Sequence, residues 1–168
     1  MGDLSMMEEN GQNTTSETAF RSERLTEDLL ERLLASGDVE AYLGETGIGE
    51  IGDRALPAFL YDMLEWHGLK RADVVRGSGI NATVVYDIFA GKSKPGRDHA
   101  IMLAFGLHCN LRETQRLLRQ SGASELWCKI RRDAIIIWCI DQGLDRAGTD
   151  DELYRFGEKT LLRTGTLS

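Results

Sequence analysis

Proline and cysteine are both scarce in this chain of 168 residues, which has two Pro and three Cys. The cysteines, Cys109, Cys128 and Cys139, are widely spaced, and no CxxC pair occurs. An odd number of scattered cysteines excludes a disulfide framework, and the pattern lacks the ligand spacing of structural zinc sites. We therefore expect buried, reduced thiols in a cytoplasmic protein, and no metal site.

Long hydrophobic runs are missing as well. The longest, AIIIWCI, covers Ala134 to Ile140 and is far shorter than the roughly 18 residues that span a bilayer. The opening MGDLSMMEEN has neither a basic start nor an apolar stretch, so we expect no secretory signal and no membrane partner. The chain also has no nucleophile–base pair, glycine-rich phosphate loop or paired-carboxylate signature. These absences predict a protein that is not an enzyme and has no cofactor.

What the chain does have is an uneven distribution of charge. Its formal net charge of −7 divides into −9 for residues 1–56 (13 acidic, 4 basic), +5 for residues 57–132 (7 acidic, 12 basic) and −3 for residues 133–168 (7 acidic, 4 basic). A basic middle segment is compatible with a phosphate-binding face; the alternative is solvated helix surface. One further hypothesis is that the acidic leader folds over this segment and competes with a polyanion, so that deleting residues 1–52 tightens binding at low salt.

Apolar residues recur with helical spacing, and glycines follow most of the helical segments, so an all-α fold is expected. Residues 1–20 are polar and are predicted to be disordered, whereas the glycine-rich residues 37–53 are predicted to form a loose connector with one helical turn at VEAYL. Pro57 suits the first turn of a helix that ends before Gly68. Further helices are predicted over residues 25–34, 71–76, 82–90, 97–105 and 125–142. Asn81 caps the helix over 82–90, and Gly106 closes the helix over 97–105. Another helix is expected to run from an Asn110–Glu113 cap to Gly122, and a last one is expected to begin at a Thr149–Glu152 capping box.

The stretch GLKRADVVRGSGINATVVYDIFAGKSKP, from Gly68 to Pro95, has the spacing of a helix-turn-helix unit. With Arg71 as the first position, such a unit needs a small or aliphatic residue at the fifth, glycine at the ninth, and aliphatic residues at the tenth, fifteenth and eighteenth. These positions hold Val75, Gly79, Ile80, Val85 and Ile88. Helical rotation of about 100° per residue predicts a core face and an outer face for the second helix. The core face has Ala82, Val85, Ile88 and Phe89, and the outer face has Thr83, Val84, Tyr86, Asp87 and Ala90.

From Leu60 to Leu118 the chain resembles the lambda-repressor-like, or XRE-type, helix-turn-helix transcriptional regulators. The resemblance is carried by WHGL (Trp66–Leu69), KRADVV, SGIN, YDIFAGKSKP and AFGL. It implies a five-helix bundle that binds double-stranded DNA, often as a dimer, to regulate transcription in bacteria or phage. On this interpretation residues 1–52 are an acidic leader with one amphipathic helix, residues 53–123 are the DNA-binding domain, and residues 124–168 are a two-helix extension.

The resemblance also implies roles for individual residues. Arg71 stands where the family has a residue that touches a phosphate and steadies the recognition helix. After the Asn81 cap, the base-reading positions are held by Thr83, Val84, Tyr86 and Asp87. Lys92 and Lys94, with Arg97, stand where the following loop meets the phosphates of the DNA backbone. The implied DNA-binding residues are Arg71, Asn81, Thr83, Val84, Tyr86, Asp87, Lys92, Lys94 and Arg97.

The outer face departs from the family in lacking Arg, Lys, Asn and Gln, the side chains best suited to bidentate recognition of guanine or adenine. Val84 offers only an apolar contact to a thymine methyl group, and Asp87 accepts from a cytosine amine but repels phosphates. The alternative function is therefore a protein-interaction adaptor that keeps the helix-turn-helix fold without binding DNA.

An apolar stripe in the predicted helix over residues 125–142 has two interpretations. It is either a homodimer interface or the side that packs on neighbouring helices. The β-branched run at 135–137 lies in a span without Gly or Pro, which favours helix over a buried strand. The stripe consists of Trp127, Ile130, Ala134, Ile137 and Trp138.

Overall fold

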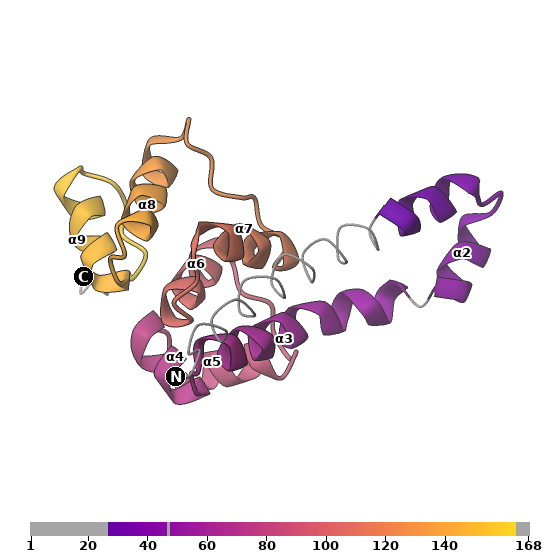
Figure 1. Cartoon of the computed structure of the whole chain (residues 1–168), viewed down its shortest axis with the longest axis horizontal. Helices are drawn as coiled ribbons and strands as arrows, with labels where there is room; N and C mark the ends of the chain where they lie inside the picture. Colours follow the sequence, from indigo (N-terminus) through magenta and orange to yellow (C-terminus); the bar gives the residue numbers. More distant parts are fainter. Residues whose placement is uncertain (1–26, 47, 164–168) are drawn as a thin grey trace, which may run out of the picture. The chain divides into compact units, whose positions relative to one another are not determined.

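The computed structural model describes residues 27–46 and 48–163 of the chain. Every regular element within those ranges is a helix, including the β-branched run at residues 135–137, so the all-α prediction is confirmed. No helix in these ranges is long and apolar enough to cross a bilayer. Contacts divide the chain into two compact units, residues 1–49 and residues 50–168 (Figure 1).

The first unit contains a helix over residues 27–35 and α2 (Val39–Thr46). The Asp38 carboxylate accepts from the Glu40 N–H at 3.0 Å and so begins α2. The buried Tyr42 donates its hydroxyl proton to the carbonyl of Leu29 at 3.0 Å, which joins α2 to the preceding helix. The amphipathic helix predicted over residues 25–34 is confirmed from residue 27 onward; the polar segment 1–20 lies outside the described residues.

The helical turn expected at VEAYL is confirmed, because it forms the start of α2, but the rest of the connector predicted over residues 37–53 is largely wrong. α2 continues to Thr46, and α3 (Ile48–His67) begins directly after Gly47, which lies outside the described residues. A glycine inside a helix costs about 1 kcal/mol relative to alanine, which weakens a helix without breaking it. The boundary predicted at residue 52 therefore falls inside α3. Pro57, expected in the first turn, also lies inside this helix, where it removes one backbone hydrogen bond.

Beyond α3, the second unit contains six more helices among its described residues (Figure 1). α4 packs closely on α6, and α8 lies beside α9. The bounds are α4 (Arg71–Ser78), α5 (Ala82–Phe89), α6 (Arg97–Gly106), α7 (Leu111–Gln120), α8 (Arg131–Asp141) and α9 (Arg146–Arg155).

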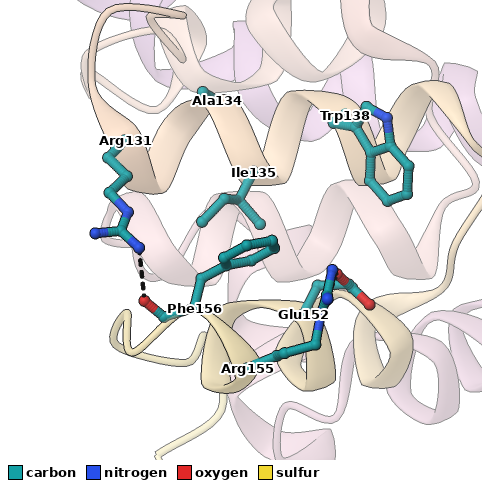
Figure 2. A pocket seen from close by; sticks show the side chains of 7 residues that line it. All are labelled: Arg131, Ala134, Ile135, Trp138, Glu152, Arg155 and Phe156. Atoms are coloured by element: carbon teal, nitrogen blue, oxygen red, sulfur yellow. Dashed lines mark hydrogen bonds and ion pairs between the residues drawn. The ribbon is translucent and has the colours of Figure 1, made fainter.

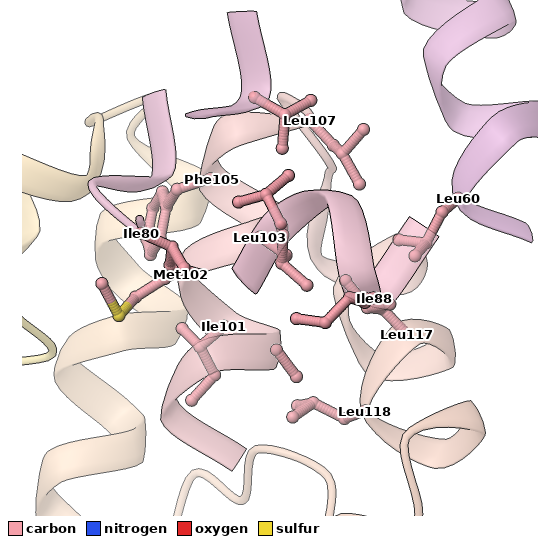
Figure 3. Packing of buried hydrophobic residues seen from close by; sticks show 14 of the residues in the cluster. Leu60, Ile80, Ile88, Ile101, Met102, Leu103, Phe105, Leu107, Leu117 and Leu118 are labelled. Carbon is pink, nitrogen blue, oxygen red and sulfur yellow. The ribbon is translucent and has the colours of Figure 1, made fainter. Parts of the chain in front are cut away.

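One cluster of buried apolar side chains joins the helices of the second unit (Figure 3). Leu60 of α3, Ile88 of α5, Leu103 of α6 and Leu117 of α7 all have an exposed fraction of 1% or less. Ile136 of α8 and Leu153 of α9 are equally buried and belong to the same cluster. The C-terminal helices therefore share the core of the bundle instead of forming a separate domain.

Gly106 is the point at which α4 and α6 approach most closely. A Cβ atom at this position would lie 2.8 Å from the carbonyl oxygen of Val74 and 3.0 Å from the nitrogen of Ser78. As predicted, α6 ends at Gly106, which is its last residue, but the positive φ that follows the helix, 57°, belongs to His108. Gly106 is thus required for helix packing, because backbone atoms of α4 leave no room for a methyl group.

Replacing Gly106 with alanine is expected to lower the free energy of unfolding by about 2–3 kcal/mol, because the clash is with backbone that cannot rotate away. Urea unfolding followed by circular dichroism measures the change. The control is Gly96→Ser, since Gly96 is the N-cap of α6, has a negative φ and has no atom near its would-be Cβ. Serine is a preferred N-cap residue, so this variant should be at least as stable as the wild type. Equal stability of the Gly106→Ala variant would contradict the close approach.

α8 begins at Arg131, six residues later than predicted. The segment before it is held by non-helical hydrogen bonds. The Gln115 side chain donates to the carbonyl of Leu126 at 2.8 Å and accepts from its N–H at 2.7 Å. The Trp127 N–H donates to the Asp133 carboxylate at 3.0 Å. These partners, rather than a Gly or Pro, keep residues 125–130 out of the helix.

The start predicted for the last helix is also wrong. α9 begins at Arg146, and its cap is Asp145, whose carboxylate accepts from the Gly148 N–H at 2.7 Å. Thr149 lies inside the helix and donates its hydroxyl proton to the Asp145 carbonyl. By contrast, the cap predicted for α7 is confirmed, because Asn110 and Glu113 exchange side-chain to backbone hydrogen bonds of 2.9 and 3.1 Å.

Candidate nucleic-acid interface

The turn between α4 and α5 has the geometry that its residues predict. Gly79 adopts φ 74°, in the left-handed region, and its N–H donates to the Val75 carbonyl at 3.2 Å. Ile80 is buried, and the Asn81 side chain accepts from the Thr83 N–H at 2.9 Å. Glycine reaches this φ without strain, and the Asn cap satisfies one of the free N–H groups of α5. Asn81 therefore acts as a helix cap through its Oδ1 atom.

The two faces of α5 largely match the prediction. Val85, Ile88 and Phe89 are buried, whereas Thr83 and Tyr86 are exposed, with 40% of Tyr86 accessible. Two of the four predicted base-reading residues are less accessible than expected. Val84 and Asp87 are half-buried, and Val84 packs against the apolar core. Thr83 and Tyr86 are therefore the side chains that project most clearly from α5.

Arg71, the first residue of α4, makes a direct contact with α5. Its guanidinium carbon lies 5.0 Å from the centre of the Tyr86 ring, within the range of a cation–π interaction. Arg71 has no carboxylate partner among the described residues. The arrangement orients the exposed ring and places a positive charge beside it. Sequence spacing alone does not indicate this contact, because it depends on the angle between the two helices.

The start of α4 is fixed by a neighbouring carboxylate. Asp73 accepts from the Lys70 N–H at 2.9 Å and forms an ion pair with Arg76. The backbone hydrogen bond from Lys70 is the main cause of the lowered pKa of Asp73, and the positive charge of Arg76 adds to it. The positive charge of Lys70 lowers the pKa of Asp73 as well, but neither Lys70 nor Arg71 forms an ion pair with another described residue.

The loop after α5 folds back onto the end of that helix. The N–H groups of Lys92 and Ser93 donate to the carbonyl of Asp87 at 2.9 and 3.4 Å, and Gly91 adopts φ 77°. Pro95 is buried and anchors the loop, whereas the side chains of Lys92 and Lys94 are exposed. Neither lysine forms an ion pair with another described residue. Two free ammonium groups therefore lie in the loop that follows the exposed residues of α5.

Cations without a carboxylate partner are concentrated around the helix-turn-helix. Of the 12 basic residues in segment 57–132, five form ion pairs within the part of the chain that the structure describes: Arg76, Arg97, Arg119, Arg131 and Arg132. The other seven are Lys70, Arg71, Lys92, Lys94, Arg112, Arg116 and Lys129. The first four belong to the motif or border it. Most of the basic residues of this segment that form no ion pair therefore lie in or beside α4 and α5.

Arg97 does not fit its predicted role as a phosphate contact. Its guanidinium binds both carboxylate oxygens of the buried Asp133, at 3.0 and 2.7 Å, and also donates to the carbonyls of Ser124 and Glu125. A second pair lies beside it, because Arg132 binds Asp98 at 2.8 Å. Two adjacent Arg and Asp residues in α6 thus pair with two in α8. The repeated Arg-Asp dipeptides at 97–98 and 132–133 were the signal in the sequence that could have suggested this pairing.

The three cysteines differ in exposure, which corrects the prediction of uniformly buried thiols. Cys139 is buried, Cys109 is half-buried and Cys128 is exposed. Loss of hydration raises the pKa of Cys109 and of Cys139, and the negative charge of Glu113 raises that of Cys109 further. Because the thiolate is the reactive form, both of these thiols should be inert in the folded protein.

In the native protein we therefore expect only Cys128 to react rapidly with a thiol reagent such as DTNB at neutral pH, with Cys109 and Cys139 reacting after unfolding. The release of thionitrobenzoate measures the number of accessible thiols. The variant Cys128→Ser should lose the rapid phase. A rapid phase that persists in that variant would contradict the burial of the other two cysteines.

No known protein family, curated protein or solved structure was found to match this chain.

Proposed function

We propose that the protein is a transcriptional regulator that binds duplex DNA through the helix-turn-helix of α4 and α5. The observation that carries the proposal is a group of four cations that form no ion pair with another described residue, around an exposed helix face: Lys70, Arg71, Lys92 and Lys94. The major groove of B-form DNA admits an α-helix, and cations beside that helix neutralise the flanking phosphates. α5 is the helix that would enter the groove, and the four cations would neutralise the phosphates beside it.

In the proposed complex the roles of the side chains follow from their exposure. Thr83 and Tyr86 project from α5 and carry hydroxyl groups that can donate to and accept from base edges. Arg71 holds the Tyr86 ring and brings positive charge to the adjacent backbone. Lys92 and Lys94 bind phosphates after the end of α5. The phosphate contacts supply affinity and position, whereas the contacts to base edges supply sequence information.

The sequence preference of this complex should be modest. The exposed face of α5 has no side chain that makes two hydrogen bonds to one base, and each good bidentate contact is worth about 1–3 kcal/mol of discrimination. Discrimination would instead depend on single hydroxyl contacts, on an apolar contact from the half-buried Val84, and on the shape of the DNA. The enriched sites should accordingly be short and tolerant of substitution.

An adaptor that binds another protein through the same surface is the second candidate function. It is favoured by the lack of bidentate base-reading groups and by the carboxylate of Asp87 on a face that would meet phosphates. The two functions differ in their response to salt. Each phosphate contact makes log K fall with log salt by about 0.9, whereas an apolar protein interface responds little.

Selection of bound duplexes from a random pool, followed by a salt series on the enriched sequence, tests the proposal. We expect enrichment of a short site and an affinity that falls steeply with added salt. If no sequence is enriched and duplex binding is undetectable even at low salt, the DNA-binding function is wrong and the adaptor is favoured.

A further inference from the structure

The turn of the helix-turn-helix is covered by a side chain from α9. Gly79, the glycine between α4 and α5, lies directly against Arg146, the first residue of α9. A Cβ atom at Gly79 would lie 2.9 Å from the Nε atom of Arg146, 3.3 Å from its guanidinium carbon and 3.5 Å from its Cδ atom. The arginine therefore occupies the space into which any side chain on residue 79 would project.

Arg146 is itself held in place by a carboxylate. Its guanidinium binds Asp150 at 2.7 Å, and the two side chains are only 17% and 13% exposed. The same carboxylate accepts from the N–H groups of Leu161 and Leu162 at 2.6 and 3.2 Å. Asp150 thus ties the start of α9 to the segment that follows this helix and orients the arginine over Gly79.

The last turn of α4, just before Gly79, packs on α6. A Cβ atom at Gly77 would lie 3.0 Å from the Cα atom of Gly106, and Ser78 is fully buried. The Ser78 hydroxyl accepts from the N–H of Ile80 at 3.2 Å. The end of α4 is therefore confined backbone to backbone, whereas Gly79 is covered by one side chain. The contact with that side chain can be removed without changing the turn itself.

We propose that Arg146 is a positioning residue for DNA recognition, because by covering Gly79 it fixes the angle between α4 and α5. The contact between Arg71 of α4 and the Tyr86 ring of α5 depends on this angle. The orientation of the exposed face of α5 toward the major groove depends on it as well. When the binding-competent geometry is populated only part of the time, the apparent affinity falls in proportion to its population. This inference rests on the proposed DNA-binding function, but the contact between Arg146 and the turn can be tested without DNA.

Amide hydrogen exchange of the full-length variant Arg146→Ala, followed by NMR, tests the contact itself. The N–H groups of Gly79 and Ile80 donate to the Val75 carbonyl and the Ser78 hydroxyl. We expect these two amides to exchange at least about fivefold faster than in the wild type, because loss of the cover favours local opening of the turn. The amides of α7 should exchange at the wild-type rate, which shows that the bundle is intact.

Two further variants separate the cover over Gly79 from the charge of Arg146. The matched control is Arg155→Ala, because Arg155 also belongs to α9 and pairs with a carboxylate of that helix, Glu152, at 2.9 Å, but lines the open groove between α8 and α9 (Figure 2). The variant Arg146→Met loses the ion pair with Asp150 but keeps an unbranched apolar chain over Gly79. Both variants should keep turn exchange close to the wild-type rate. Exchange as fast in Arg146→Met as in Arg146→Ala would overturn the contact with Gly79 as the cause.

Titration of the duplex enriched by selection with the same variants tests the role in recognition. We expect Arg146→Ala to weaken binding at least about fivefold at every salt concentration, with an unchanged slope of log K against log salt, because the molecules that bind still make every phosphate contact. A direct phosphate contact by Arg146 would instead make the slope less negative by about 0.9 and would overturn the positioning role. Arg155→Ala and Arg146→Met should bind with close to wild-type affinity.

The outcomes distinguish this inference from the DNA-binding proposal. Unchanged exchange of Gly79 and Ile80 in Arg146→Ala would overturn the inference whether or not the protein binds DNA. Faster exchange with an unchanged duplex affinity would also overturn it, because recognition would then not depend on the cover. A wild-type protein that binds no duplex at any salt concentration would overturn the proposed function and the positioning role together, while the exchange rates would still decide whether Arg146 holds the turn.

Discussion

Replacing Arg97 with methionine is expected to lower the free energy of unfolding by about 3–5 kcal/mol, the usual cost of removing one partner of a buried ion pair. The Asp133 side chain is only 2% exposed, and Arg97 supplies two of the three hydrogen bonds that its carboxylate accepts. Without the guanidinium, the carboxylate keeps only the Trp127 N–H. Methionine retains much of the length of the side chain, so the decrease in the free energy of unfolding would come mainly from the missing charge and its hydrogen bonds.

Urea unfolding measures this change, and Arg119→Met is the matched control. Arg119 also pairs with a carboxylate, that of Glu125, but the two side chains are 59% and 45% exposed. An exposed pair is worth at most about 1 kcal/mol, so the control should be close to wild type in stability. Equal stability of the two variants would contradict the structural role of Arg97 and return it to the set of candidate phosphate contacts.

Replacing Lys92 and Lys94 together with glutamine is expected to weaken duplex binding at low salt by at least about tenfold and to make the slope of log K against log salt less negative by about 1.8, since each phosphate contact contributes about 0.9. Both side chains are exposed and have no carboxylate partner among the described residues, so the substitutions should not destabilise the fold. Fluorescence anisotropy of a labelled duplex over a salt series gives both quantities.

The control for this prediction is the double variant Arg112→Gln with Lys129→Gln. It changes the net charge by the same amount, and both residues are exposed but lie outside the helix-turn-helix and its loop. If DNA binding depended only on total charge, the two double variants would lose the same affinity. The proposal instead requires that the control variant keeps a salt slope close to that of the wild type.

These two predictions concern neighbouring parts of the chain. Lys92 and Lys94 lie in the loop that ends at α6, and Arg97 is the first residue of that helix. Through Asp133, Arg97 connects this point to α8, and the adjacent Asp98 does the same through Arg132. The C-terminal helices therefore fix the helix that follows the lysine loop. In the proposed DNA complex, the lysine contacts to the DNA backbone would thus be positioned by residues that do not touch DNA.

The elements that were predictable from the sequence are those set by local chemistry. The turn at Gly79, the cap at Asn81 and the buried face of α5 depend on residues a few positions apart, and all three appear as expected. The Asn110–Glu113 cap is local in the same sense. At the two caps a side chain satisfies backbone groups of its own turn, at Gly79 the absence of a side chain permits the positive φ, and on α5 helical periodicity sets the buried face. Local spacing determines all of these outcomes.

The features that sequence reasoning missed depend on contacts between distant segments. α8 begins late because Gln115 and Asp133 capture the backbone of Leu126 and Trp127. Arg97 resembled a phosphate contact because its partner lies 36 residues further along the chain. Local helix propensity and charge patterns cannot reveal such pairs. The early start of α3 was missed for another reason, because glycines were taken to break a helix that they only weaken.

The most direct test of the central claim is a titration of ¹⁵N-labelled protein with duplex DNA, followed by amide chemical shifts. Binding through the outer side of α5 predicts the largest changes at Arg71, Thr83, Tyr86, Lys92 and Lys94, with little change at the exposed residues of α8 and α9. Shifts centred on the C-terminal helices, or no shifts at low salt, would contradict recognition of DNA by this helix-turn-helix.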